Sequence, residues 1–284
     1  MGREAPRNEL LMLQARAISI KTRFLAMYKK ANAGHIGSSL SCTELLVFLR
    51  FAWMSDGDRF VLSKGHAAGA LYSLLAEEGR LTPEDIDSFY AEGTHLSALP
   101  PFGAIEEIPF ATGSLGYGLS ICAGMALGAK FKGEPKRFFC VTSDGELNEG
   151  SVWEAALFIA HHRLKNVIWM IDRNKIQAIG RTEDVLALEP LRAKLAAFGF
   201  RVISVKGHDF DALRAARDEC DSLLQESNQP VVLLADTVKG HGISFMEGTV
   251  DCHYLPLDDN QYALAVSELT RAYEESRGGH EDAI

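Results

Sequence analysis

The sequence predicts an α/β fold in three layers, in which helices cover both faces of a mainly parallel β-sheet. Short, continuously apolar segments alternate along the chain with longer amphipathic ones, which is the pattern of buried parallel strands and the helices that connect them. The 284 residues are 47% hydrophobic and 24% charged, as is typical of a globular protein. No internal repeat or long linker divides the chain, so we expect residues 1–284 to form one domain.

Five short apolar segments are predicted to form the strands of the sheet. Their continuous apolar character indicates burial on both faces, because strands of a parallel sheet are covered by helices on either side. The strands are expected at residues 59–62, 138–142, 167–172, 201–205 and 231–237.

Segments with apolar residues at helical spacing are predicted to form the helices. In the first of them, Leu11, Ala15 and Ile18 recur at this spacing, and Thr82-Pro83 supplies a cap and a first-turn residue for another. We expect helices at residues 7–32, 42–54, 67–78, 83–91, 148–162, 188–198, 209–226 and 258–277, followed by a mobile charged tail at 277–284.

The charge and the cysteine content argue against several classes of protein. The net charge of −9 disfavours binding to nucleic acids and to anionic membranes. The five cysteines are scattered and form no CxxC pair, which argues against a disulfide framework or a zinc site and favours the reducing cytoplasm. The sequence shows no signal-peptide pattern and no apolar run long enough to span a bilayer.

Two polar residues follow neighbouring strands, where open parallel sheets bind their ligands. Asp144 comes just after the strand at 138–142, and Asn174, thirty residues later, follows the strand at 167–172. That separation is one strand–helix–strand unit, so both side chains can project toward one point, where their oxygens suit Mg²⁺ or Ca²⁺. Taken singly, either residue reads more simply as part of a turn or cap. As a pair, with Gly145 beside Asp144, they favour a metal site.

The segments around this pair resemble the thiamine diphosphate motif of the transketolase family, in which Gly-Asp-Gly is followed by an Asn at a similar distance. Here the two segments read SDGELNEGSVWEA and DRNKIQAIG. Further segments that look like transketolases run through almost the whole chain: NAGHIGSSLSCTELL, DRFVLSKGHAAGALYSLLAEEG, ATGSLGYGLSICAGMALGAK, GHDFDAL and TVKGHGISFMEG. The resemblance implies a thiamine diphosphate-binding fold.

The resemblance also implies two cofactors, thiamine diphosphate and Mg²⁺, with Ca²⁺ or Mn²⁺ as substitutes for the metal. Asp144 and Asn174 would bind the metal through their side chains and Ile176 through its carbonyl oxygen. The metal would in turn bind the diphosphate and offset its charge. The cofactor-binding residues implied in this way are His66, Gly113, Ser114, Leu115, Gly145, Glu146, Glu149, Asn174 and His253.

Two of these assignments have a simpler alternative. The loop from Gly113 to Gly116 would run past the cofactor, with Leu115 packed against the thiamine, but its glycines also suit a tightly packed helix N-terminus. Glu149 resembles the glutamate that couples paired active sites across a subunit interface, but it also reads as a first-turn glutamate favoured by the helix dipole.

Three histidines are the catalytic residues that the resemblance implies. His35 and His66 match positions lining the cofactor and substrate channel, with His66 near the diphosphate and His35 near the donor's hydroxyl and carbonyl groups. His253 matches a histidine near the substrate, although the family's Trp-His-Gly reads Cys252-His253-Tyr254 here. The histidines expected to be structural or exposed are His161, His162, His208 and His280.

Three positions depart from the family pattern. Ser143 replaces the first glycine of Gly-Asp-Gly and Ile36 replaces a common proline, and both changes are expected to be tolerated. Leu99 stands where transketolases carry a histidine near the donor's terminal hydroxyl. Because leucine cannot form hydrogen bonds, we expect an altered donor or acceptor, such as a less hydroxylated ketol or a pyruvate-like donor. The alternative is that His95 turns in to compensate.

The resemblance finally implies a partner. Transketolases continue well beyond the length of this chain with a domain that binds the aminopyrimidine, so we expect a second, C-terminal transketolase-like subunit, in an α₂β₂ assembly. The compact end of the sequence favours a naturally split enzyme over a truncated one.

The expected reaction is transfer of a two-carbon ketol unit from a ketose or ketose phosphate to an aldehyde. The alternatives are another thiamine diphosphate carboligase, with a pyruvate-type or deoxy-ketol donor, and a non-catalytic scaffolding partner. A generic nucleotide-binding protein ranks last, because no GxGxxG or GxxxxGK(S/T) motif follows a predicted strand.

Overall fold

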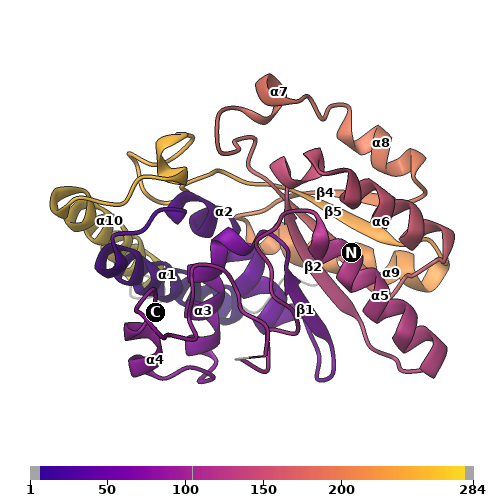
Figure 1. The fold of residues 1–284 in the computed structure, drawn as a ribbon, viewed down its shortest axis with the longest axis horizontal. Helices are drawn as coiled ribbons and strands as arrows, with labels where there is room; N and C mark the ends of the chain where they lie inside the picture. Colours follow the sequence, from indigo (N-terminus) through magenta and orange to yellow (C-terminus); the bar gives the residue numbers. More distant parts are fainter. Residues whose placement is uncertain (1–6, 104, 279–284) are drawn as a thin grey trace.

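The computed structural model describes residues 7–103 and 105–278. Within them, five strands form one sheet in the order β1-β2-β3-β5-β4 (Figure 1). Neighbouring strands are all parallel, so every strand ends at the same edge of the sheet. The strands are β1 (Arg59–Leu62), β2 (Phe138–Ser143), β3 (Val167–Arg173), β4 (Arg201–Lys206) and β5 (Val231–Asp236).

The alternation of side chains along the strands builds two hydrophobic cores, one on each face of the sheet. In β3, Ile168 and Met170 belong to one core, whereas Val167, Trp169 and Ile171 belong to the other. All five side chains are fully buried. Burial of apolar surface stabilises a fold by about 25 cal/mol per Å², so both layers of helices are held to the sheet by these residues.

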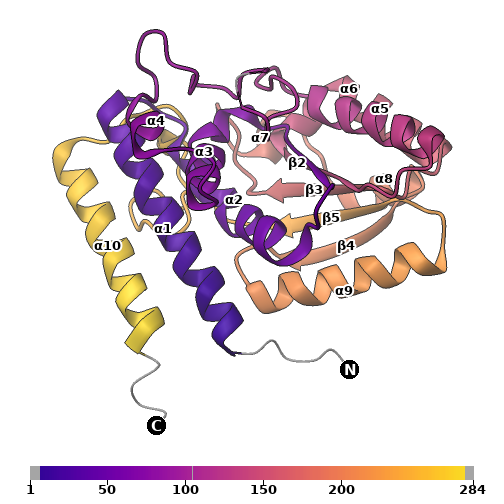
Figure 2. The same ribbon diagram turned by 90° about the horizontal axis from the view of Figure 1, so that it is seen from below.

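One face of the sheet carries the helices at the two ends of the described chain. Figure 2 shows α1 and α10 side by side, and α9 lying along β4 and β5. The helices of this layer are α1 (Arg7–Ala31), α2 (Ile36–Phe48) with a π-helical turn at Leu49–Trp53, α3 (Ala68–Glu77), α9 (Phe210–Glu226) and α10 (Asp259–Gly278).

The opposite face carries α5, which contacts β2 and β3, and α8, which contacts β4, while α6 packs on α5. These helices are α5 (Tyr117–Lys132), α6 (Gly150–His161) and α8 (Leu191–Ala197). The remaining elements are short: α4 (Pro83–Asp87), α7 (Thr182–Val185) and 3₁₀ turns at Gly65–Ala67, Gly145–Asn148 and Asp251–His253.

This architecture confirms the predicted three-layer fold with a parallel sheet, and no strand boundary differs from its prediction by more than one residue. The start of α2 differs more: the helix begins at Ile36, not at 42. The stretch from 36 to 41 contains glycine and serine, which are poor helix formers, but its small side chains are buried. A Cβ at Gly37, for example, would lie 2.2 Å from Cys252 Sγ.

For α5, the sequence indicates only a helix N-terminus near Gly116, and the helix itself extends to Lys132. Its internal glycines lower helix propensity. Gly118 is required by packing nonetheless, because a Cβ there would lie 2.3 Å from Ser63 Oγ. Two other helices are shorter than predicted, since α4 ends at Asp87 and α8 begins at Leu191.

The C-terminal helix includes the first residues of the predicted mobile tail, because α10 extends to Gly278. The rest of that tail, residues 279–284, lies outside the described residues. None of the helices in the described part of the chain combines the length and the apolar character needed to cross a membrane.

Candidate active site

The candidate site lies at the edge where the parallel strands end. β2 runs directly into Asp144 and β3 into Asn174. β1 leads into the turn that carries Lys64 and His66, and β5 leads within three residues to Lys239. Chain segments far apart in sequence therefore bring polar side chains to one place, as open parallel sheets do at the carboxyl ends of their strands.

The three predicted metal ligands lie together in the turns after β2 and β3. Asp144 Oδ2 accepts a hydrogen bond from Lys175 N at 2.7 Å, and Asn174 Oδ1 accepts one from Ile176 N at 3.1 Å. Asp144, Asn174 and Ile176 are all buried, with exposures of 2%, 7% and 7%. A carboxylate, a carboxamide oxygen and a peptide carbonyl therefore lie close together after the ends of β2 and β3.

Asp144 is a carboxylate whose charged form the protein disfavours. Burial, with the neighbouring charge of Asp172, raises the pKa of Asp144 from 3.8 to about 6. Hydrogen bonds from Lys175 N, Gly145 N and the Thr182 hydroxyl group oppose this shift without cancelling it. A nearby cation would favour the ionised carboxylate.

The three predicted catalytic histidines converge beside this oxygen set. His35 precedes α2 in the left-handed conformation, with φ of 70°, while His66 and His253 lie in short 3₁₀ turns. The ring centroid of His35 lies 5.7 Å from that of His66 and 5.1 Å from that of His253. The rings of His66 and His253 are 5.5 Å apart. Tyr254, 56% exposed, borders the cluster, with its ring 4.5 Å from that of His253.

All three imidazoles are neutral at pH 7. Burial is the main cause that lowers their pKa values, and the positive charge of Lys239 acts in the same direction. The pKa of His253 falls to about 3, and the pKa of His66 falls well below 6.5. Each neutral ring offers one N–H donor and one acceptor nitrogen, which suits it to exchange protons with hydroxyl or carbonyl groups.

Lys239 joins the oxygen set to the histidines. Its Nζ lies 3.1 Å from the carbonyl oxygen of Ile176 and 2.6 Å from Nδ1 of His253. Lys239 is only 1% exposed, and within the described residues it forms no ion pair with a carboxylate. Burial lowers its pKa from 10.5 to about 8. A buried ammonium group without an anionic partner suits an anionic ligand.

These observations test whether Mg²⁺ and a diphosphate fit the residues present. The oxygens of Asp144, Asn174 and Ile176 are the hard donors that Mg²⁺ prefers, and Mg²⁺ usually shares its shell with phosphate groups. The raised pKa of Asp144 indicates a carboxylate that lacks compensating positive charge. Lys239 supplies a buried positive charge for an anion. The residues fit both groups.

The predicted glycine loop runs up to the N-terminus of α5. Gly113 has φ of +143°, and a Cβ there would lie 2.4 Å from Leu99 Cδ1. Gly116 has φ of +90°, and a Cβ there would lie 2.3 Å from Ser151 Oγ. Between them, Ser114 is exposed and Leu115 is half-buried. The loop therefore combines close backbone approach with a helix N-terminus, which are the two interpretations that the sequence allows.

Glu146 fastens this loop to the turn after β2. Its Oε1 accepts hydrogen bonds from Gly116 N at 2.8 Å and from the Ser63 hydroxyl group, while Oε2 accepts one from Ser143 N at 3.3 Å. With 0% exposure, this carboxylate supports its neighbours and is not open to a ligand. Glu149, by contrast, is exposed at the start of α6.

Leu99 lies against the glycine loop. Its side chain is 40% exposed, and its Cδ1 contacts the backbone at Gly113. His95 does not turn in to take its place, because His95 Nε2 lies 3.3 Å from Asp85 Oδ1 at α4. The structure therefore leaves a leucine without a compensating histidine from position 95.

Three charged residues at this edge were not identified from the sequence: Lys64, Asp172 and Lys239. Lys64 and Asp172 form an ion pair with 0% exposure, and Asp172 Oδ2 accepts a hydrogen bond from Asn174 Nδ2. The signal that could have found them is a charged residue at the end of an apolar strand, because charged side chains are almost never fully buried unless they are paired or bind a ligand.

Glu44, His208 and His241 form a separate cluster, with ligand atoms within 4.8 Å of one another. His208 Nε2 accepts a hydrogen bond from Val238 N at 2.8 Å, which leaves the proton on Nδ1, 2.9 Å from Glu44 Oε2. Lys21 Nζ lies 2.6 Å from the same carboxylate. The cluster is therefore an ion-pair network that holds the loop after β5, in line with the structural role predicted for His208.

The other histidines lie elsewhere or are not described. His161 and His162 stand at the end of α6, where the His162 ring packs on Phe158 with 4.3 Å between centroids. His280 lies outside the described residues.

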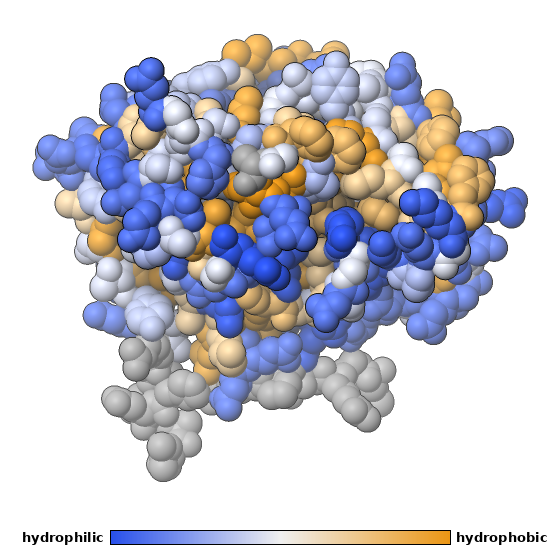
Figure 3. Space-filling view, turned by 60° about the horizontal axis from the view of Figure 1, so that its bottom comes forward, coloured by the Kyte–Doolittle hydropathy of each residue, from blue (hydrophilic) through white to orange (hydrophobic). Residues whose placement is uncertain are grey.

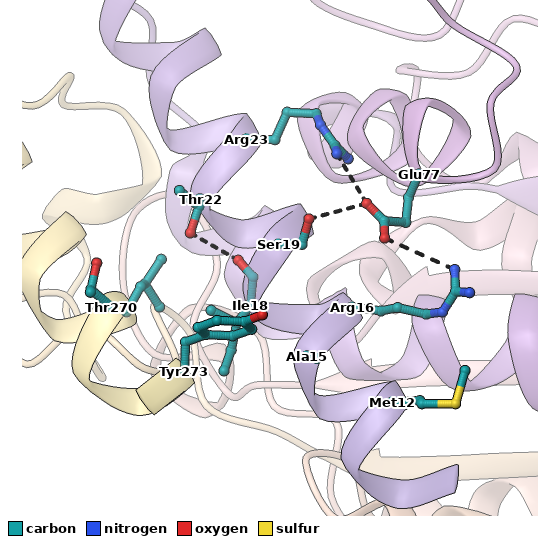
Figure 4. Close-up of a pocket in the computed structure, with 11 residues that line it drawn as sticks. Met12, Ala15, Arg16, Ile18, Ser19, Thr22, Arg23, Glu77, Thr270 and Tyr273 are labelled. Atoms are coloured by element: carbon teal, nitrogen blue, oxygen red, sulfur yellow. Dashed lines mark hydrogen bonds and ion pairs between the residues drawn. The ribbon is translucent and has the colours of Figure 1, made fainter. Parts of the chain in front are cut away.

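A groove of about 700 Å³ lies between α1, the end of α3 and α10 (Figure 4). In it the side chains of Arg16, Ser19 and Arg23 converge on the Glu77 carboxylate, at 4.0, 3.1 and 3.0 Å. These polar groups satisfy one another, and no predicted site residue lines the groove. The predicted site residues lie at the sheet edge instead.

The surface also exposes large apolar side chains. Figure 3 shows apolar side chains gathered near the middle of one face, bordered by polar ones. Among the exposed apolar residues, Phe102 (70%) stacks on Phe110 with 6.0 Å between ring centroids, and Ile179 is 77% exposed. Exposed apolar surface that gathers in patches marks contacts with other proteins.

Comparison with known proteins agrees with this geometry. Residues 14–275 match the family model described as the thiamine diphosphate binding domain of transketolase. The chain is 37% identical over 268 residues to the 6-deoxy-6-sulfo-D-fructose transketolase subunit SqwG of Clostridium sp. (strain MSTE9), covering 91% of this chain and 96% of that protein. It is 35% identical over 267 residues to an apulose-4-phosphate transketolase subunit of Actinobacillus succinogenes, covering 90% and 95%.

Longer proteins match along only part of their length. The crystal structure of transketolase from Campylobacter jejuni superposes with a TM-score of 0.83 at 26% identity, covering 93% of this chain and 45% of that one. Human transketolase is 34% identical over 250 residues, covering 84% of this chain and 39% of that protein. The chain thus spans less than half the length of these transketolases.

Proposed function

Since this chain belongs to the transketolase family, we propose that it is the diphosphate-binding subunit of a thiamine diphosphate- and Mg²⁺-dependent transferase. The enzyme would move a two-carbon ketol unit from a ketose donor to an aldehyde acceptor. The observation that carries the proposal is Lys239, whose Nζ contacts both Ile176 O, at 3.1 Å, and His253 Nδ1, at 2.6 Å. One buried cation thereby links an oxygen set for a metal to a histidine cluster for proton transfer.

The oxygen set and the glycine loop would hold the cofactor. Asp144, Asn174 and the Ile176 carbonyl group would bind Mg²⁺, and Lys239 would offset the remaining diphosphate charge. The backbone at Gly113 offers close approach to a ligand because no side chain stands there. When bound, thiamine diphosphate supplies the carbanion chemistry that breaks and forms carbon–carbon bonds beside a ketone.

The histidines would move protons on the sugar substrates. A protonated Lys239 donates its hydrogen bond to His253 Nδ1, so the ring proton of His253 is on Nε2 and can be donated to a substrate oxygen. The low pKa values of His35 and His66 keep an acceptor nitrogen available on each ring at pH 7. Together the rings offer both donors and acceptors to the donor's hydroxyl and carbonyl groups.

A partner protein would complete the site. Relatives of this length carry names that call them transketolase subunits, and the longer transketolases contain an additional segment of similar size. We expect that partner to bring the pyrimidine-binding domain, in an α₂β₂ assembly. The exposed apolar side chains Phe102, Phe110 and Ile179 would then be covered on assembly.

The test measures thiamine diphosphate binding by the co-purified complex, with and without Mg²⁺, in wild type and Asp144→Ala. We expect Mg²⁺-dependent binding in the wild type and its loss in the variant. Asp56→Ala, a change at an exposed carboxylate, is the matched control and should bind as the wild type does. Absence of binding in the wild-type complex would overturn the catalytic proposal and favour a scaffolding role.

Leu99 favours a second candidate, a carboligase that uses a less hydroxylated or pyruvate-type donor. The names of two relatives make 6-deoxy-6-sulfo-D-fructose and apulose 4-phosphate the first donors to test on this chain, followed by pyruvate. Leu99→His should raise activity on ordinary ketose phosphates, because it restores a hydrogen-bonding group beside Gly113. An unchanged ratio of kcat/KM between donors would show that Leu99 does not select them.

A further inference from the structure

A fully buried ion pair lies next to the proposed cation site and contacts the Asn174 side chain. Lys64 follows β1 and Asp172 lies near the end of β3, and both side chains have 0% exposure. Neither residue is among the proposed ligands or the histidines. Such a pair needs an explanation, because removing two charges from water costs several kcal/mol per ion before their attraction offsets it.

The carboxylate of Asp172 is the acceptor of a convergent network. One oxygen, Oδ1, accepts a hydrogen bond from the hydroxyl group of Thr237, which follows β5. The other, Oδ2, accepts from Ser41 Oγ at 2.6 Å, from Lys64 Nζ, and from Asn174 Nδ2 at 3.4 Å. Ser41 lies in α2, so one carboxylate contacts four different segments of the chain.

Lys64 uses its remaining donors in the same place. Its Nζ donates to the carbonyl oxygen of Ser38 at 2.9 Å and to Ser41 Oγ at 3.3 Å. Both acceptors belong to the first turns of α2, just after His35. Lys64 itself stands two residues before His66, so its contacts also fix the turn that carries this histidine.

The contacts of Asn174 show what the pair does for the cation site. Its Nδ2 donates toward the ion pair, to Ser41 Oγ at 3.3 Å and to Asp172 Oδ2. Its Oδ1 is thereby turned away from the ion pair, and accepts from Ile176 N at 3.1 Å. Without Asp172 as an anionic acceptor for Nδ2, the amide would be free to rotate and present its N–H groups to the cation instead of its oxygen.

On the basis of the proposed function, we propose that Lys64 and Asp172 are positioning residues that orient the Asn174 amide toward the metal. Asp172 anchors Nδ2, and Lys64 keeps the buried carboxylate charged and in place. Stability alone does not explain the two charges, because apolar residues of similar size often replace a buried ion pair with no loss of stability. Loss of a group that orients a metal ligand typically lowers metal affinity 10–100-fold.

One set of variants tells an effect on the stability of the fold apart from an effect on metal affinity. Lys64→Met and Asp172→Leu as single changes each leave one buried charge unpaired, so both should lower the urea midpoint of the cofactor-free chain. The double variant removes both charges, and its midpoint should recover part of that loss, since the hydroxyl groups of Ser41 and Thr237 still lack their acceptor. Its affinity for Mn²⁺ in the presence of thiamine diphosphate should nevertheless stay at least ten-fold below that of the wild type.

The control is another ion pair far from the site. Arg50 and Glu78 are joined by two hydrogen bonds, of 2.8 and 2.7 Å, between the turn after α2 and the end of α3. The double variant Arg50→Met/Glu78→Gln removes these charges without touching Asn174. We expect its Mn²⁺ affinity to equal that of the wild type, even where its urea midpoint changes.

Two measurements on the full chain with its co-purified partner decide the matter. Electron paramagnetic resonance gives Mn²⁺ affinity, and NMR follows hydrogen exchange of the Asn174 side-chain amide in the cofactor-free state. Slow amide exchange in the wild type, fast exchange in the Lys64→Met/Asp172→Leu variant and a ten-fold loss of affinity support the proposal.

Equal affinity in that variant, or equal amide exchange, overturns it. A wild type that binds no Mn²⁺ with thiamine diphosphate overturns the proposed function instead, while the amide exchange still reports whether the pair orients Asn174. The two failures are therefore distinguishable.

Discussion

Replacing Asp144 with asparagine should stabilise the cofactor-free protein increasingly as the pH rises. The carboxyl group has a pKa of about 6 in the folded protein and an ordinary value of 3.8. Below 3.8 it is protonated in both the folded and the unfolded chain. Between 3.8 and about 6 the unfolded chain ionises first, so the wild type loses stability that the variant keeps, and the loss is complete above about 6.

The size of this effect follows from the pKa shift. A shift of about two units, at about 1.4 kcal/mol per unit, destabilises the wild type by about 3 kcal/mol at neutral pH. Roughly half of that is already present at pH 5, so about 1.5 kcal/mol should accumulate between pH 5 and pH 8. Asparagine also changes the hydrogen bonds from Lys175 N and Gly145 N, but this contribution does not depend on pH and cancels in the comparison.

The assay is urea unfolding at pH 5 and pH 8, with EDTA and without cofactor, for the wild type, Asp144→Asn and the exposed control Asp56→Asn. The free energy of unfolding of Asp144→Asn should gain about 1.5 kcal/mol on that of the wild type over this range, and the control should gain nothing. Mg²⁺ with thiamine diphosphate should then stabilise only the wild type and the control. Parallel pH dependence of Asp144→Asn and the wild type would refute the reasoning.

Two further changes test other parts of the site. Gly113→Ala places a Cβ 2.4 Å from Leu99 at φ of +143°, and should lower the free energy of unfolding by about 1–3 kcal/mol in urea titrations. Gly79→Ala, at φ of +72° but in open space, should cost less. Burial, with the charge of Lys239 as a smaller cause, lowers the pKa of His253 from 6.5 to about 3, and Lys239→Met removes that charge. NMR titration should find that pKa higher but still below 6.5, because burial is the larger cause; an unchanged pKa would show that the charge has no influence on the ring.

The sheet could be predicted from the sequence because its signal is local. Each strand is a short apolar run, and a run such as 138–142 has few other uses in a globular protein. The parallel pairing follows from the helices between the runs. The site residues that follow β2 and β3 could be predicted for the same reason, since Asp144 and Asn174 need only their strand ends to be placed.

The helices that were missed or misplaced depend on contacts that no local pattern carries. The first turn of α2 is helical because Gly37 fits against Cys252, more than two hundred residues away in sequence. The role of Glu146 is similar: a glutamate in a cofactor motif suggests a ligand, but its two oxygens are used by Gly116 N, Ser63 and Ser143 N. Only the packed structure shows which polar group is left for a ligand.

The dependence on packing also explains why two copies of one tripeptide have different surroundings. Lys64-Gly65-His66 and Lys239-Gly240-His241 follow β1 and β5, and both lysines are buried. Burial is the largest single influence on the pKa of Lys64 and lowers it, but the charges of Asp172, Cys42 and Asp144 and the hydrogen bond to Asp172 together raise that pKa, whereas burial lowers the pKa of Lys239 to about 8. The difference is the carboxylate: Lys64 has one within ion-pair distance, whereas the hydrogen-bond partners of Lys239 among the described residues are carbonyl oxygens and a histidine nitrogen.

The histidines of the two tripeptides also lie in different surroundings. His66 lies with His35 and His253, the three predicted catalytic histidines, while His241 stacks on His208 with 3.6 Å between ring centroids and belongs to the network of Glu44. In one copy the lysine pairs with a carboxylate and the histidine lies among His35 and His253. In the other the lysine lies against His253 and the histidine belongs to the cluster of Glu44 and His208. Because β1 is an edge strand and β5 lies inside the sheet, the same three residues meet different neighbours, and those neighbours decide which side chain is free to act.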